Sequence, residues 1–275
     1  YKTPAEELAW LLSQQLYNRG CGYFQDGMIK FEMKGTRASG DLNTSLGNCI
    51  LMCAMTYAWR KVSGIEAALA NNGDDCDYLM SAKDEEPWRN GLIEYFAKKG
   101  FRMELEDTAY ELEQLEFCQS KPVCIDGHYR MIRNPKTLIT KASMCLLPIQ
   151  NHKQLRKWMM AVGVAEGSLA QSVPVLQSFA RCMRRNGLRC SKRLIAATFY
   201  GSTRMYHASM QARTSAIDDS NRASFWKAFG ILPSEQIALE QYYDAYTVGD
   251  VYDYVPEFMA VERAATMPCT VPNLL

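Results

Sequence analysis

Apolar and polar positions alternate along this chain in two distinct periods, one helical and one typical of strands. Residues 4–18 are predicted to form a helix, because Pro4 lies in the first turn and apolar residues follow at helical spacing. The apolar stripe consists of Leu8, Leu11, Leu12 and Leu16. Asp26-Gly27, between two runs rich in aromatic and aliphatic residues, predicts a hairpin turn.

The same patterns predict further elements downstream. They indicate a long helix over residues 43–61, a strand pair within 67–80 with Gly73 in its turn, a helix over 87–99 that ends at Gly100, and a hairpin that pairs residues 116–123 with 128–132. After Pro135 the pattern is mostly helical, with helices expected at 152–162, 165–186, 218–229 and 234–246. The chain is therefore predicted to be α+β, with a change of character near residue 136.

Charge changes at the same place. Residues 136–213 hold thirteen Lys or Arg and one acidic residue, Glu166, although the whole chain carries a net charge of only +1. A basic segment between two acidic ones suits a groove that follows a phosphate backbone. A solvated basic face is the alternative, and composition leaves both open.

Composition excludes several classes of protein. The longest nearly uncharged apolar stretch, residues 49–59, is too short to span a membrane. The ten cysteines show no Cys-x-x-Cys pair, which favours small buried side chains in a reducing compartment. No histidine (128, 152 or 207) is placed beside a nucleophile, which argues against a protease. The chain begins at Tyr1 without a leader, and we expect it to be an internal piece of a longer protein.

The sequence Gly73-Asp74-Asp75 places two carboxylates at the predicted hairpin turn. Glycine permits the positive φ angle of a tight turn, so both carboxylates can point into a cleft. Magnesium prefers oxygen ligands, and phosphodiester synthesis uses two such ions about 3.5 to 4 Å apart. Taken alone, Gly-Asp-Asp is also common in solvated surface turns.

A second group of residues lies at the start of the predicted helix 43–61. Thr44 and Asn48 are four residues apart and share one helical face. On the opposite face we expect an apolar stripe to pack on the core, formed by Leu46, Cys49, Ile50, Cys53, Ala54 and Tyr57. A ribose hydroxyl, or a carboxylate that reads one, would satisfy the polar pair. Capping by Asp41, Asn43 or Thr44 would explain the first turn but not Asn48.

These two groups together resemble motifs B and C of positive-strand RNA virus polymerases. The spacing Ser-Gly-x-x-x-Thr-x-x-x-Asn over residues 39–48, followed by Gly-Asp-Asp, carries the resemblance. The chain is most similar to the tombusvirus-like group in the strings at residues 35–44, 71–76 and 116–119, the last with the Asp126-Gly127 hairpin. The resemblance covers residues 4–150.

The resemblance implies a right-hand polymerase fold with incomplete fingers. Residues 1–38 would be a remnant of the connection between fingers and palm. Residues 39–135 would form the palm, of antiparallel strands with helices, carrying motifs B, C, D and E. Beyond residue 150 the expectation rests on position and charge, by which residues 136–275 would form a mainly helical thumb. Its basic residues would touch the template or product duplex, above all Arg181, Arg184, Arg185, Arg189, Lys192 and Arg193.

Roles carry over to matching positions. Asp74 would bind the catalytic metal, with a lesser role for Asp75. Ser39 and Gly40 would be the hinge of the motif B loop, and Thr44 and Asn48 would recognise the ribose 2′-hydroxyl.

Two further motifs are matched by position. Phe117-Cys118-Gln119 would support the primer 3′ end as motif E. Lys98 and Lys99 fall near motif D, where a general acid for pyrophosphate is expected, although a solvated helix end explains them better.

The activity implied is template-directed synthesis of RNA from ribonucleoside triphosphates by two-metal-ion phosphoryl transfer, replicating a viral genome. The implied cofactor is Mg²⁺, for which Mn²⁺ can substitute. The implied partners are RNA template and product, nucleoside triphosphates, the upstream part of the same polymerase and other viral replication proteins. The expected place is the host cytoplasm, in complexes associated with membranes through regions outside this segment.

The sequence departs from the family in one respect. Motif A supplies two aspartates separated by four residues, whereas the acidic residues before Ser39 are Glu6, Glu7, Asp26 and Glu32. The basic fingers motif that grips the triphosphate is also missing. We therefore expect the segment to begin just after motif A and to be inactive alone. Three alternatives remain: a non-catalytic RNA-binding module, another palm enzyme such as a reverse transcriptase, and a structural zinc domain.

Overall fold

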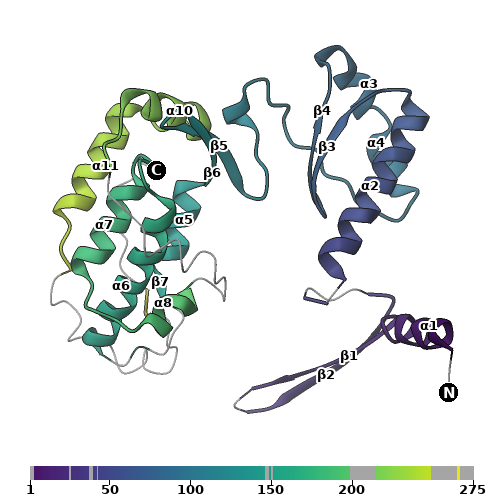
Figure 1. Cartoon of the computed structure of the whole chain (residues 1–275), viewed down its shortest axis with the longest axis horizontal. Helices are drawn as coiled ribbons and strands as arrows, with labels where there is room; N and C mark the ends of the chain where they lie inside the picture. The colour runs from purple at the N-terminus through teal and green to yellow at the C-terminus, as the bar shows by residue number, and fades with distance from the viewer. Residues whose placement is uncertain are drawn as a thin grey trace. The chain divides into compact units, whose positions relative to one another are not determined.

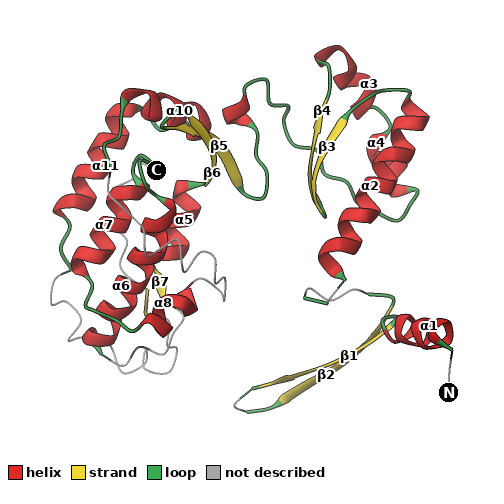
Figure 2. Cartoon of the chain, in the orientation of Figure 1, coloured by secondary structure: helices red, strands yellow, loops and turns green. Residues whose placement is uncertain are grey.

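The computed structural model describes residues 3–24, 26–36, 40–41, 43–145, 149, 151–198, 215–248 and 265–266. In this part of the chain, helices alternate with two-stranded antiparallel sheets, which confirms the α+β prediction (Figures 1 and 2). Contacts divide the chain into two compact units, residues 1–106 and residues 107–275. This division precedes the expected boundary between palm and thumb at residue 136, and the assignment of palm and thumb stays a prediction.

The first unit begins with helix α1 (Pro4–Gln14) and a hairpin of β1 (Tyr17–Tyr23) and β2 (Met28–Lys34). Thr3 starts the helix with a capping box, in which its hydroxyl accepts the Glu6 N–H and the Glu6 carboxylate accepts the Thr3 N–H. The helix ends before the predicted residue 18 because the chain turns into β1. The hairpin predicted from Asp26-Gly27 is confirmed.

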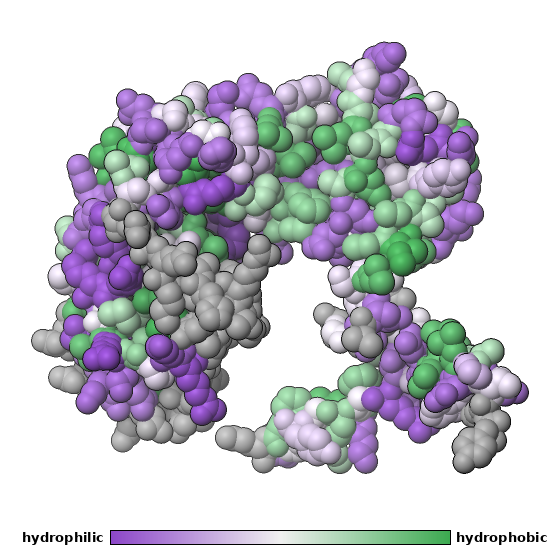
Figure 3. Space-filling model, viewed as in Figure 1, coloured by the Kyte–Doolittle hydropathy of each residue, from purple (hydrophilic) through white to green (hydrophobic). Residues whose placement is uncertain are grey.

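The apolar side chains of these three elements lie at the surface (Figure 3). Helix α1 buries none of its residues, so the predicted stripe of leucines is solvent-exposed. The hairpin also exposes large apolar side chains, namely Tyr17, Tyr23, Met28, Ile29, Phe31 and Met33. The sequence pattern identified an apolar face here but not its burial.

The core of the first unit is formed mainly by one long and two short helices, with a small hairpin packed beside them. Helix α2 (Thr44–Ser63) is followed by β3 (Ala68–Asn72), β4 (Asp75–Leu79), a 3₁₀ turn η1 (Ala82–Asp84), α3 (Glu85–Arg89) and α4 (Leu92–Ala97). The core consists of Met55, Trp59, Ala67, Trp88, Leu92 and Phe96. The rings of Trp59 and Trp88 meet edge to face, with centroids 6.2 Å apart.

One helix predicted over residues 87–99 is two short helices in the structure. The break falls at Asn90-Gly91, where Gly91 has a φ of +82°. A Cβ at this glycine would lie 3.2 Å from the ring of Trp59, so a glycine both reverses the chain and lets it approach the core.

Helix α2 buries a different face from the one predicted. Leu46, Ile50 and Tyr57 of the predicted stripe are 67%, 60% and 60% exposed. The buried residues are Met55, Thr56 and Trp59, with Met52 half-buried, and at steps of three and four these continue the face of Asn48. The polar pair therefore lies at one end of the buried face, because the β3–β4 hairpin packs on that side of the helix.

The second unit combines one hairpin with a group of helices. Its elements are η2 (Leu112–Gln114), β5 (Ser120–Ile125), β6 (His128–Arg133), α5 (Pro135–Ala142), β7 (Met144–Cys145), α6 (His152–Leu169), α7 (Leu176–Asn186), α8 (Lys192–Thr198), α10 (Asp219–Phe229), α11 (Pro233–Ala245) and β8 (Ala265–Thr266). The core includes the fully buried Val123, Met159, Phe179, Phe225 and Leu239. The helix predicted over 165–186 is interrupted, because Pro174 removes a backbone donor and Val175 has a φ of +64°.

Helix α10 holds the β5–β6 hairpin through side chains. Ser224 accepts the backbone N–H of Cys124 at 2.8 Å, and Asn221 accepts that of Asp126 at 3.1 Å. The buried carboxylate of Glu113 accepts hydrogen bonds from Ser224 and from Tyr129 of β6. These contacts explain why the hairpin belongs to the second unit, with the helices that follow it.

The cysteines and the helices bear on two further predictions. The nine cysteines in the described ranges are all free thiols, and only Cys145 and Cys182 are buried. The prediction of small buried side chains thus holds for two of them. No helix in the described ranges has the length and apolar character needed to cross a membrane.

Candidate functional site

The turn that carries the two aspartates is a two-residue hairpin connection. Asn72 of β3 pairs with Asp75 of β4, which leaves Gly73 and Asp74 as the turn. Gly73 has a φ of +89°, the left-handed conformation that the first position of a type II′ turn requires. Gly73 is buried, whereas Asp74 and Asp75 are exposed. The predicted strand pair is therefore confirmed, and its tip presents carboxylates to solvent.

The turn lies directly against helix α2. A Cβ built on Gly73 would be 3.3 Å from the Cβ of Asn48, which is tighter than ordinary contact. Glycine is therefore needed here for two reasons, the backbone conformation and the close approach. Farther along the strands, the Tyr78 hydroxyl meets Thr56 of α2 at 3.3 Å and the sulfur of Met52 at 3.8 Å. The hairpin and the helix thus pack along one continuous face.

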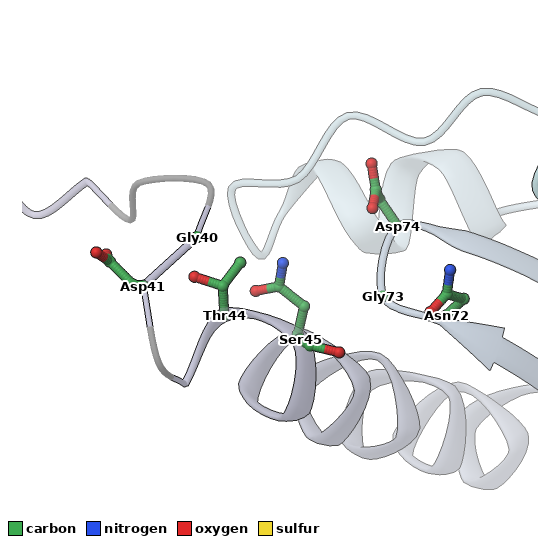
Figure 4. A pocket seen from close by; sticks show the side chains of 8 residues that line it. Gly40, Asp41, Thr44, Ser45, Asn72, Gly73 and Asp74 are labelled. Atoms are coloured by element: carbon green, nitrogen blue, oxygen red, sulfur yellow. The ribbon is translucent and has the colours of Figure 1, made fainter. Parts of the chain in front are cut away.

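A cavity of about 320 Å³ lies between the turn and the start of the helix (Figure 4). It is lined by Gly40, Asp41, Thr44, Ser45, Asn48, Asn72, Gly73 and Asp74. Figure 4 shows Asp74 at the tip of the turn and Thr44 at the first turn of α2, and both residues line the cavity. The cavity unites two sequence motifs that are separated by about 25 residues along the chain.

Most of the predicted site residues meet in this cavity. Gly40, Thr44, Asn48 and Asp74 line it, whereas Asp75, the other predicted metal ligand, is not among its lining residues. Ser39, predicted to be part of the hinge, lies outside the described residues.

The capping alternative fails for one residue. The side chain of Asn43 makes no cap to α2 and instead donates to the side-chain oxygen of Gln15 at 2.8 Å.

Three lining residues had no predicted role, namely Asp41, Ser45 and Asn72. Asp41 and Asn72 both belong to the strings that carried the resemblance, which was the available signal. Ser45 follows Thr44 on the helix, and no periodic pattern distinguishes it.

Burial and like charge shape the electrostatics behind the turn. Burial raises the pKa of the Cys76 thiol, and the neighbouring carboxylates of residues 74, 75 and 77 add to the effect. This thiol therefore stays protonated at neutral pH and is not a nucleophile. Burial likewise raises the pKa of the Tyr78 hydroxyl.

Asp77 is the most constrained carboxyl group in the hairpin. Burial raises its pKa, and the negative charges of Glu106 and Asp75 act in the same direction. One of its carboxylate oxygens is buried without a hydrogen-bond partner in the described chain. Because side chains alternate along a strand, Asp77 faces away from α2, on the side opposite Cys76 and Tyr78.

Replacing Asp77 by asparagine is expected to stabilise the chain at neutral pH. A carboxyl whose pKa is raised on folding binds its proton more tightly when folded, so stability falls as pH rises above the usual value of 3.8. Asp77→Asn should therefore raise the thermal unfolding midpoint by a few degrees at about pH 7 and leave it unchanged at about pH 3. Asp107→Asn, at an exposed position, serves as the control. If the Asp77→Asn variant and the unchanged chain had the same unfolding midpoint at both pH values, the raised pKa of Asp77 would be contradicted.

The donors around the cavity are oxygens of carboxylate, hydroxyl and amide groups. Such a set fits a hard divalent cation better than zinc, which favours thiolate and imidazole. Asp74 is the carboxylate in the turn that lines the cavity, and Asp41, in the loop before α2, is a second lining residue with a carboxylate. Within the described residues, no three His, Cys, Asp or Glu side chains are grouped as a complete metal site.

The residues matched to motif E form a tight turn rather than a strand. Phe117 and Ser120 exchange backbone hydrogen bonds, and Cys118 and Gln119 between them have φ angles of +53° and +58°. Strand β5 consequently starts at Ser120, not at residue 116. Two neighbouring left-handed residues that are not glycine store strain, which persists only where the surroundings impose it.

The two lysines matched to motif D are at the end of α4. Lys98 pairs with Glu94 at 2.8 Å, and both side chains are largely exposed. The Lys99 ammonium lies 5.7 Å from the ring centre of Tyr95. Both contacts fit the solvated helix end that the sequence favoured.

Part of the basic segment is engaged within the second unit. Arg181 binds Asp244 of α11, and Arg185 donates to the backbone carbonyls of Tyr243 and Tyr246. Arg156 donates to the carbonyl of Asn186. The remaining predicted contacts, Arg184, Arg189, Lys192 and Arg193, are exposed.

Comparison with known proteins identifies relatives across nearly the whole chain. The family model described as "Viral RNA dependent RNA polymerase" matches residues 1–249. The RNA-directed RNA polymerase of Tobacco necrosis virus (strain D) is 42% identical over 246 residues, and that of strain A is 39% identical over 252 residues. A putative RNA-directed RNA polymerase of Barley yellow dwarf virus (isolate MAV) is 40% identical over 245 residues. These matches cover 87% to 91% of this chain but only 28% to 34% of the relatives' length.

Proposed function

The chain belongs to the viral RNA-dependent RNA polymerase family, and we propose that within a longer protein it carries one half of the site for template-directed RNA synthesis. The observation that supports this most is the shared cavity, which Asp74, Thr44 and Asn48 all line. A polymerase must bind a metal ion and recognise a sugar within one small space, because the triphosphate that the metal binds and the sugar belong to the same nucleotide. The cavity has residues suited to each task on its two sides.

Asp74 is proposed to hold a divalent metal ion, Mg²⁺ or in its place Mn²⁺. When bound, such ions activate the attacking hydroxyl and neutralise charge on the triphosphate. The carboxylate lies at the tip of a tight turn, so few backbone torsions separate it from the packed strands. Asp75 does not line the cavity, and we assign it a supporting role.

Thr44 and Asn48 are proposed to recognise the ribose 2′-hydroxyl. They lie one turn apart on α2, with a hydroxyl and an amide that can both donate and accept hydrogen bonds. A site that binds a hydroxyl in this way discriminates strongly against a sugar that lacks it. Gly40, with its φ of +96°, is proposed to act with Ser39 as the hinge of the loop that precedes the helix.

The second half of the site is proposed to come from residues outside this chain. The acidic residues before Ser39 include no pair of aspartates separated by four positions. We therefore propose that the upstream part of the same polymerase supplies the other aspartates and that the segment alone is inactive.

RNA contacts are proposed for the second unit. The exposed Arg184, Arg189, Lys192 and Arg193 would bind phosphates of the template or product, with an affinity that falls steeply as salt increases. The strained turn at Cys118-Gln119 is proposed to support the 3′ end of the growing strand. Replication in the host cytoplasm, in membrane-associated complexes with other viral proteins, is part of the same proposal.

Replacing Asn48 by alanine in the full-length polymerase tests the proposal. We expect the preference for ATP over 2′-deoxyATP to fall about 10- to 100-fold, because a hydrogen bond to the sugar is worth roughly 1 to 3 kcal/mol when its loss leaves a partner unsatisfied. The measurement is single-nucleotide extension on an RNA template with each substrate. Asn90→Ala, at a residue outside the cavity, is the control. An unchanged preference would contradict the role of Asn48 and show that the polymerase recognises the sugar through other residues.

A further inference from the structure

The side chain of Asn71 joins the turn to helix α2 through both ends of its amide. Its Nδ2 donates to the backbone carbonyl oxygen of Cys49 at 2.9 Å and lies 3.3 Å from the Cys53 sulfur. Its Oδ1 accepts the backbone N–H of Gly73 at 2.8 Å. One amide group therefore contacts two elements that come from different parts of the sequence.

The contacts with Cys49 and Gly73 each adjoin a residue of the proposed site. Cys49 follows Asn48, which lines the cavity on the helix side. Gly73 precedes Asp74, which lines it on the turn side. Asn71 itself is half-buried and is not among the lining residues. It can therefore affect a bound nucleotide only through its neighbours.

We propose that Asn71 is a positioning residue that sets the distance between the metal-binding Asp74 and the ribose-reading Asn48. The inference rests on the proposed function. In it, the bond to Gly73 shapes the turn that presents Asp74, and the bond to Cys49 fixes the helix against that turn. Sugar selection depends on both, because the ribose and the triphosphate of one nucleotide must fit the two groups at once.

The chemistry explains why an amide suits this position. The site needs a donor toward the helix carbonyl and an acceptor toward the turn N–H, and the asparagine amide offers both on one short planar group. Cys49 is within a helix, so its carbonyl already has the partner that helical geometry provides and uses Asn71 as a second one. The Gly73 N–H, in contrast, is at a buried residue and needs the acceptor.

Strand alternation separates Asn71 from its identical neighbour. Asn71 pairs with Cys76 on the side that faces α2, whereas Asn72 lines the cavity. The two asparagines of the Asn-Asn-Gly-Asp-Asp string therefore have different positions: Asn71 lies between the turn and helix α2, and Asn72 lies at the cavity.

Two variants of the full-length polymerase separate the two bonds. Asn71→Ala removes both, and we expect the ATP over 2′-deoxyATP preference to fall about tenfold, the change that roughly one net hydrogen bond produces. The Mg²⁺ concentration for half-maximal activity should rise severalfold. Asn71→Asp keeps an acceptor for Gly73 but loses the donor to Cys49. It should therefore lose sugar preference while it keeps a near-normal Mg²⁺ requirement.

Thermal unfolding of each variant shows whether it is folded, and Asn90→Ala serves as a matched control outside the cavity. If Asn71→Ala does not fold, the sugar preference and Mg²⁺ requirement of the Asn71→Asp variant test the inference. The inference is overturned if sugar preference and Mg²⁺ requirement equal those of the unchanged enzyme. It is also overturned if incorporation of both substrates falls equally, because that pattern indicates a structural role only. Failure of the proposed function is a separate result, namely incorporation that survives loss of the Asp74 carboxylate.

Discussion

Alanine in place of Asp74 is expected to lower template-directed nucleotide incorporation by the full-length polymerase roughly 10³-fold or more. A catalytic metal stabilises the transition state by several kcal/mol, and each 1.36 kcal/mol corresponds to about a factor of ten in rate. Asp74 is the carboxylate of the turn that lines the cavity beside Asn48. The measurement is incorporation of a labelled ribonucleotide on an RNA template, at several Mg²⁺ and Mn²⁺ concentrations.

Two further variants make this result specific. Asp75→Ala should cause a smaller loss, because Asp75 does not line the cavity. Asp107→Ala, at an exposed carboxylate outside the cavity, should leave incorporation unchanged. Nucleotide incorporation by the Asp74→Ala variant equal to that of the unchanged polymerase would contradict the proposed function. It would favour a non-catalytic RNA-binding module in which the acidic turn is incidental.

The second large effect is expected at Gly73. Alanine there must adopt a φ near +89°, which costs an L-residue about 1 to 3 kcal/mol, and its Cβ would meet that of Asn48 at 3.3 Å. The turn can relieve both only by moving away from the helix. A displacement of about 1 Å at a reacting group lowers rates on the order of 10²-fold, and we expect a loss of that size in incorporation.

Gly100→Ala is the matched control for this prediction. Gly100 has a φ of +85°, close to that of Gly73, but a Cβ at this glycine would meet nothing within 4 Å. Both variants should lose thermal stability through backbone strain, Gly73→Ala the more because of its added contact with Asn48, while only Gly73→Ala should lose activity. Equal activity losses in the two variants would show that the contact with Asn48 does not account for the effect.

Local patterns predicted the elements of the site well. The hairpin at Gly73 and the helix that carries Thr44 and Asn48 were both expected at the positions where the structure has them. Both depend on short-range physics: glycine permits the turn, and residues four apart share a helical face. For the same reason the hairpin at Asp26-Gly27 was predicted, and its strands extend farther than expected.

Breaks within helices were harder to predict than helices themselves. Two helices were predicted over 152–162 and 165–186, whereas the structure has α6 continuous through the predicted gap to Leu169 and the break at Pro174 instead. At Gly91 the break serves the packing of Trp59, a residue more than thirty positions earlier. Such contacts over long sequence separation leave no periodic signal.

The sequence by itself determined which chemical groups this protein brings to its site and where they stand along the chain. Asp74 in a glycine turn, and a Thr44–Asn48 pair one helical turn apart, follow from residue type and spacing alone. Only the tertiary structure decided that these groups line one cavity, and that α2 turns its Asn48 face inward. The physical reason is that a helix with apolar residues on two faces buries whichever face a neighbour covers. Here the neighbours are the β3–β4 hairpin, joined to the helix through Asn71, and helices α3 and α4, which pack against Trp59.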